Sequence, residues 1–156
     1  MNVFYLSKCP TEAAQMQCDK HVVKMILETA QLLSTAHHIS GSGGCYKVTH
    51  KNHPSAVWAR QSTGNYRWLY AHLEALSDEY TNRYDKVHKT WREHAESLSR
   101  CPEGIPLGSQ TTPPQCMPDE CKNNDTVLAY RVYYNLKADE WADKGSPMKW
   151  RGNSYD

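Results

Sequence analysis

One amphipathic segment, residues 18–33, indicates the architecture to expect: Cys18-Asp19-Lys20-His21-Val22-Val23-Lys24-Met25-Ile26-Leu27-Glu28-Thr29-Ala30-Gln31-Leu32-Leu33. Its polar and apolar residues recur at the spacing of opposite faces of an α-helix. The face expected to pack into a core consists of Val22, Val23, Ile26, Leu27, Ala30 and Leu33. The polar stripe consists of Gln17, Lys20, His21, Lys24, Glu28, Gln31 and Thr35. Such a stripe suits phosphate binding or proton transfer, whereas the ordinary alternative is a solvated helix face.

Helical periodicity and capping signals extend this pattern to the rest of the chain. The expected helices cover residues 11–36, 54–61, 65–84, 89–100 and 126–141, and Gly64 is expected to interrupt between the second and third of them. Residues 3–6 form either a short strand or an apolar plug, so any β element is minor. The fold class is therefore mainly α, a single-domain helical bundle over residues 1–156.

Two segments outside the helices are expected to have their own roles. Residues 101–122 are rich in proline and lack periodicity, which predicts a long surface loop or an ordered lid. The tail, residues 143–156, carries Trp150 and Tyr155, so we expect it to dock onto the domain.

Composition limits the class of protein. The 156 residues carry a formal charge of only +1, so any binding of anions must be local. There is no basic and apolar leader and no stretch long enough to span a membrane, which predicts a cytoplasmic protein whose six cysteines are reduced thiols.

Two clusters are candidates for binding a phosphorylated ligand. The first precedes an expected helix start, where free backbone N–H groups favour anions, and continues into cations and aromatic rings: His50, Lys51, Asn52, His53, Arg60, Asn65, Tyr66 and Trp68. The second combines cations with a base-stacking ring: Arg83, Tyr84, Lys86, His88 and Lys89. The alternatives are that His53 only caps its helix, that His50 is merely exposed, and that the second cluster is a solvated corner.

A metal site is not expected. His37, His38, Cys45, His50 and His53 lie in one short region, but their spacing fits none of the common zinc patterns. No phosphate-binding glycine loop or dinucleotide fingerprint is present, so no cofactor is expected either.

Three motifs carry a resemblance that spans most of the chain. They are CDKHVVKM at residues 18–25, LETAQLLSTAHH at residues 27–38 and THKNHP at residues 49–54. The pattern resembles a group of small uncharacterised proteins encoded by tailed bacteriophages. The resemblance implies a viral setting in the host cytoplasm, and it implies no particular activity.

The residue chemistry and the viral setting favour one function over two alternatives. The favoured function is binding of a small phosphorylated nucleotide, through which a phage could sequester a host immune signalling nucleotide. The first alternative is an enzyme acting on a nucleotide or nucleic acid, such as a hydrolase, nuclease or glycosylase, with His21, Glu28 and His53 in acid–base roles. The second is a module that binds DNA or a host protein. A homo-oligomer is left open, and no membrane partner is expected.

Overall fold

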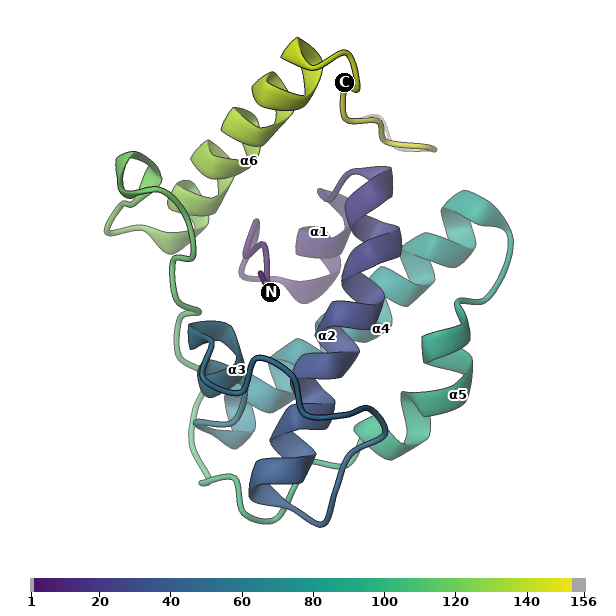
Figure 1. The fold of residues 1–156 in the computed structure, drawn as a ribbon, viewed down its shortest axis with the longest axis vertical. Coiled ribbons are helices and arrows are strands. Elements are labelled where there is room, and N and C mark those ends of the chain that lie inside the picture. The colour runs from purple at the N-terminus through teal and green to yellow at the C-terminus, as the bar shows by residue number, and fades with distance from the viewer. Residues whose placement is uncertain (1, 153–156) are drawn as a thin grey trace.

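The computed structural model describes residues 2–152 and contains helices but no strand within that range (Figure 1). This confirms the mainly α prediction. The six α-helices are α1 (Pro10–Gln15), α2 (Asp19–Ser40), α3 (Pro54–Ala59), α4 (Thr63–Tyr84), α5 (Lys89–Leu98) and α6 (Thr126–Asp143), with a 3₁₀ turn η1 (Asp119–Cys121) before α6.

The centre of the molecule is the packing of α2 against α4. Helices α1, α3 and α5 surround this pair, and α6 lies to one side, with the N-terminal segment between it and α2 (Figure 1). Residues 3–6 are a buried plug rather than a strand. The fully buried side chains that join the central helices include Val22, Ile26, Leu33, Leu69, Leu73 and Leu76.

The first predicted helix is in fact two helices, and the prediction of one continuous helix over residues 11–36 was wrong. The chain leaves the helical conformation at Cys18, which has an extended backbone (φ −68°, ψ 164°) and forms the N-cap of α2. The N–H of Cys18 donates to the Tyr134 hydroxyl, and the N–H of Asp19 donates to the Lys149 carbonyl. Distant segments therefore satisfy the donors at the start of α2.

The sequence indicated that Gly64 interrupts the helical structure, and this prediction was wrong. Gly64 lies in the first turn of α4. Ser62 caps that helix by accepting a hydrogen bond from the Asn65 N–H. A side chain at position 64 would clash with the backbone of Gln110, so this glycine allows the proline-rich loop to pack against α4.

The prediction of which residues form the polar and apolar faces of α2 was also partly wrong. Gln17 and Thr35 are fully buried, whereas Val23 and Leu27 are 37% and 39% exposed. The Gln17 side-chain amide nitrogen binds the His72 ring, and the Thr35 hydroxyl binds the backbone of Thr49, so both of these buried groups have partners inside the protein. Because several elements pack around α2, its buried surface is wider than a single apolar stripe.

The C-terminal segment contacts the junction of α1 and α2. The Trp150 indole donates to the Met16 carbonyl at 3.0 Å, and the Arg151 N–H donates to Asp19 at 2.8 Å. Tyr155, the other aromatic residue of the expected docked tail, lies outside the described residues. None of the described helices is long and apolar enough to cross a membrane.

Candidate active site

A hollow of about 270 Å³ lies where five separate segments meet. We call it the His21 pocket. The N-terminal segment, α2, the start of α3, the proline-rich loop and α6 each contribute to its walls. Its lining residues are Asn2, Phe4, His21, Lys24, Met25, Glu28, His53, Cys116, Tyr133 and Lys137.

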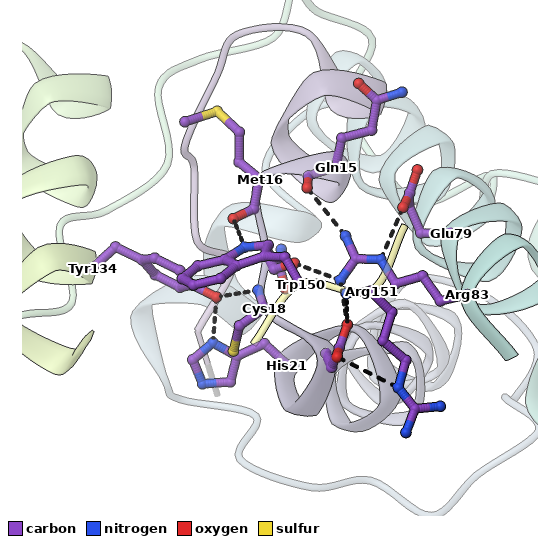
Figure 2. Close-up of polar contacts among 11 residues, drawn as sticks. Gln15, Met16, Cys18, His21, Glu79, Arg83, Tyr134, Trp150 and Arg151 are labelled. Atoms are coloured by element: carbon purple, nitrogen blue, oxygen red, sulfur yellow. Dashed lines mark hydrogen bonds and ion pairs between the residues drawn. The ribbon is translucent and has the colours of Figure 1, made fainter. Parts of the chain in front are cut away.

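His21 is the most constrained side chain of the pocket. It is only 6% exposed, and its Nδ1 lies 2.8 Å from the hydroxyl of Tyr134 on α6 (Figure 2). Phe4 stacks on the ring with centroids 4.5 Å apart, and Trp141 meets it edge-on at 5.1 Å. Burial, and then the charges of Lys137 and Lys24, lower the His21 pKa to about 4, so the ring is neutral at pH 7.

The N-terminal plug, residues 3–6, forms the part of the pocket wall that stacks on His21, and it does so with a strained backbone at Phe4. Phe4 has a φ of +52°, a region that bulky L residues rarely occupy. The Asn2 side chain stabilises the conformation, because it accepts from the Phe4 N–H and donates to the Cys116 carbonyl. Strained backbone of this kind is found most often at functional sites.

Lys24, Glu28 and Lys137 place charges around the hollow. The Lys24 amine lies 3.7 Å from the Glu28 carboxylate, one helical turn away, and the two side chains are 71% and 19% exposed respectively. The Lys137 amine sits over the Tyr133 ring, 5.2 Å from its centroid. The pocket thus offers two cations for an anionic ligand and one carboxylate for proton transfer.

His53 borders the pocket from the start of α3. Its Nδ1 accepts a hydrogen bond from the Ser55 N–H at 3.1 Å, so it caps the helix and also lines the hollow. Its pKa is lowered, mainly by burial. A neutral His53 that accepts at Nδ1 carries its proton on Nε2.

Three residues of the first predicted binding cluster are core residues instead, and this part of the prediction was wrong. Asn65 is fully buried and binds the Trp58 carbonyl and Thr111, and Tyr66 is 1% exposed and donates to the Leu98 carbonyl. Trp68 is 7% exposed, with its indole on the Lys8 carbonyl. Their polar atoms serve loop and helix ends, so they are closed to a ligand.

Arg83 of the second cluster is likewise structural. Its side chain is 1% exposed and donates to Asp19, Glu79 and the carbonyls of Gln15 and Gln17 (Figure 2). These contacts hold α4 against the break between α1 and α2. These contacts occupy four of the five guanidinium N–H groups, and the buried side chain is closed to a phosphate.

The other predicted residues lie around the His21 pocket rather than in it. Lys20 and Tyr84 line a separate hollow with Trp141 and Arg151, and His88 and Lys89 line an apolar groove beside Lys24 and Glu28. The six remaining residues do not line the His21 pocket. Four are exposed and two are half-buried: His50, Lys51, Asn52 and Lys86, and Gln31 and Arg60 respectively.

Sequence reasoning missed six of the ten residues that line the pocket. The lining residues that it did not single out as a site are Asn2, Phe4, Met25, Cys116, Tyr133 and Lys137, and it treated Tyr134 as helix packing. Only the spacing of Tyr133 and Lys137, one helical turn apart, gave a signal. Within residues 2–152 no group of His, Cys, Asp or Glu is arranged to hold a metal, and all six cysteines are free thiols.

This arrangement is that of a helical protein with a polar pocket, in which two lysine amines, a carboxylate and two imidazoles line one hollow. The sequence profile of one family, described as pyrimidine dimer DNA glycosylase, matches residues 1–93. The match covers more than half of the 156 residues, and the chain belongs to this family. No curated protein and no solved structure matches the chain.

Membership of this family corrects the favoured sequence-based function. A protein that sequesters a host immune nucleotide was the wrong prediction, because the family is one of DNA glycosylases. The alternative of an enzyme acting on nucleic acid fits the family match better. His21, Lys24, Glu28 and His53 lie within the matched residues, whereas Cys116, Tyr133, Tyr134 and Lys137 lie beyond them.

Proposed function

We propose that this protein is a DNA glycosylase that cleaves the bond between deoxyribose and a damaged pyrimidine in the His21 pocket. The observation that carries the proposal is the meeting of Glu28, Lys24, His21 and His53 in one hollow, inside the segment that matches the glycosylase family. DNA is the proposed partner, in place of a small free nucleotide. The host cytoplasm and the phage origin stay predictions that rest on the resemblance.

The chemistry requires a group that stabilises positive charge on the sugar. When the C1′–N bond breaks, its electron pair leaves with the base and C1′ becomes cationic in character. The Glu28 carboxylate is the acidic side chain of the pocket lining and is suited to stabilise that cation. It is also suited to take a proton from the water whose oxygen adds to C1′, and to return that proton to the departing base nitrogen, so that the sugar gains OH and the base gains H.

The two lysines and the imidazoles of the pocket would bind the DNA while the C1′–N bond is cleaved. Lys24 and Lys137 are placed to contact the phosphates beside the damaged nucleotide. Enzymes that act on a base take it out of the stack, and a pocket with walls from five segments offers it a place to bind. His53, with Nε2 protonated, can donate to a phosphate or carbonyl oxygen.

The test uses a duplex oligonucleotide that carries one cyclobutane thymine dimer and a label at its end. Incubation with the protein, followed by alkali, should cut the damaged strand at the dimer and leave an undamaged duplex intact. Glu28→Gln should lower the rate of C1′–N bond cleavage, read as alkali-sensitive strand breaks, at least about 100-fold, because it removes the carboxylate charge at the reacting carbon.

Glu96→Gln is the matched control. Glu96 also faces a cation one helical turn away, Arg100, but its side chain is 91% exposed on α5 and remote from the pocket lining. We expect this variant to match the wild-type rate. Binding of damaged DNA without any cleavage of the C1′–N bond would instead support a DNA-binding module, and would overturn the glycosylase proposal.

A further inference from the structure

Tyr134 makes two hydrogen bonds with its hydroxyl, and they are not equivalent. The Cys18 N–H can only donate, so at 2.7 Å it uses a lone pair of the phenol oxygen. The second partner, His21 Nδ1 at 2.8 Å, can accept or donate, depending on the tautomer. Figure 2 shows the hydroxyl between the two groups.

The proton of the Tyr134 hydroxyl decides between the tautomers. Tyr134 is 6% exposed, so this proton needs an acceptor inside the protein. The Cys18 thiol also interacts with the hydroxyl, but sulfur is a weak acceptor compared with an imidazole nitrogen. The best partner for the phenol proton is therefore Nδ1, which places the imidazole proton on Nε2.

We infer that Tyr134 is a positioning residue that holds His21 as the Nε2–H tautomer, so that His21 offers the DNA substrate a neutral hydrogen-bond donor rather than a base. This rests on the proposed function for its substrate. Nε2 lies on the opposite edge of the ring from Tyr134. Turning the ring over would exchange Nδ1 for a carbon, and it is opposed by the packing of Phe4 and Trp141 on the imidazole.

The surroundings of His21 keep it neutral in this role. Lys24 on α2 and Lys137 on α6 are the charged groups that lower its pKa after burial, and the remaining neighbours on the ring are aromatic. Burial also raises the pKa of Tyr134, so its hydroxyl stays protonated. A neutral donor beside Glu28 leaves the carboxylate as the proton acceptor of the pocket.

The inference reaches beyond the segment that defines the family. His21 lies within residues 1–93, whereas the residue that fixes its tautomer comes 113 positions later, on α6. The matched segment alone would therefore contain the imidazole without the group that orients it.

The first test is spectroscopic and needs no substrate. Long-range ¹H–¹⁵N correlation on the full chain with ¹⁵N-labelled histidine, at pH 7, reports which ring nitrogen carries the proton. We expect His21 to have a bare Nδ1 and a protonated Nε2, with its signals assigned by their loss in His21→Gln. In Tyr134→Phe, the same ring should become a mixture of tautomers. Tyr130→Phe removes another buried hydroxyl of α6, one that donates to the Pro114 carbonyl, and should leave the His21 signals unchanged.

The second test measures excision of the thymine dimer. Tyr134→Phe should lower kcat about tenfold with little change in KM, because the donor loses its fixed direction rather than its contact with DNA. His21→Gln keeps a neutral N–H donor and should retain at least about tenfold more activity than His21→Ala.

Three results would overturn the inference: a proton on Nδ1 in the wild type, no tautomer change in Tyr134→Phe, or equal loss of activity in the Gln and Ala variants. A wild-type protein that leaves the C1′–N bonds of the thymine dimer intact would contradict the proposed function instead, and would leave the tautomer assignment in place.

Discussion

Arg83 illustrates what can and cannot be learned from a residue and its neighbours in sequence. An arginine beside Tyr84 and Lys86 has the composition of a nucleic-acid contact, and that was the interpretation of the sequence. In the structure, Asp19, 64 positions away, and the carbonyls of Gln15 and Gln17 take its donors. No local pattern names such partners. By contrast, the sequence did place Lys24 and Glu28 correctly relative to each other, because they share one helix face.

The burial of Arg83 leads to a prediction about stability. Arg83→Lys keeps the charge but loses the planar fork that reaches several acceptors at once. The free energy of unfolding, measured by urea titration, should fall by about 3 kcal/mol. Arg100→Lys is the control, because Arg100 also pairs with a glutamate four residues earlier in the chain but is 80% exposed, and it should change the value by less than about 0.5 kcal/mol. Equal effects of the two substitutions would contradict the structural role of Arg83.

At the level of whole helices, sequence signals predict best those helix ends that are capped by a side chain of the same segment. The starts of α4 and α5 lie within two residues of the predicted positions, since Ser62 and His88 cap them with their own side chains. The break at Cys18 has no such signal, because its donors are satisfied from α6 and the tail. His72 is a related case: it joins α4 to α1 by contacts with Gln17 and the Pro10 carbonyl.

The burial of His72 predicts a loss of stability in acid. Burial lowers its pKa from 6.5 to about 4 in the folded protein, so the unfolded chain takes up the proton first as the pH falls. The free energy of unfolding should therefore decrease by about 3 kcal/mol between pH 6.5 and pH 4 from this residue, and by a further amount from His21.

Urea titrations across that pH range, on the wild type and on His72→Gln, check this expectation. The variant should show a clearly shallower decrease, whatever its stability at pH 7. Identical slopes for the two proteins would mean that His72 is already protonated or accessible in the folded state.

Over the whole molecule, the low net charge and the distance in sequence between the segments of the pocket explain why the site could be predicted only in part. A net charge of +1 gives no signal of a DNA-binding surface. The cations of the pocket come from α2 and α6, which are far apart in sequence. The helical class and the placement of His21, Lys24 and Glu28 on α2 followed from periodicity. The N-terminal plug and α6 carry no pattern that points to a shared hollow, because their meeting depends on tertiary packing.

Local cations predict a specific salt dependence of DNA binding. Lys24→Ala and Lys137→Ala should each reduce the slope of log K against log salt concentration by about 1, as expected for the loss of one phosphate contact. Lys144→Ala, at the end of α6 and outside the pocket lining, should leave the slope unchanged. Fluorescence anisotropy with a labelled duplex at several salt concentrations measures the slopes. Parallel lines for all the proteins would mean that DNA binds on another face.

The hydrogen bond between His21 and Tyr134 spans 113 residues and so also sets when the protein can begin to work. During synthesis, the ribosome makes α2 about 100 residues before α6. A nascent chain therefore has the His21 imidazole before it has Tyr134, which orients it, and the pocket is complete only after α6 has left the ribosomal exit tunnel.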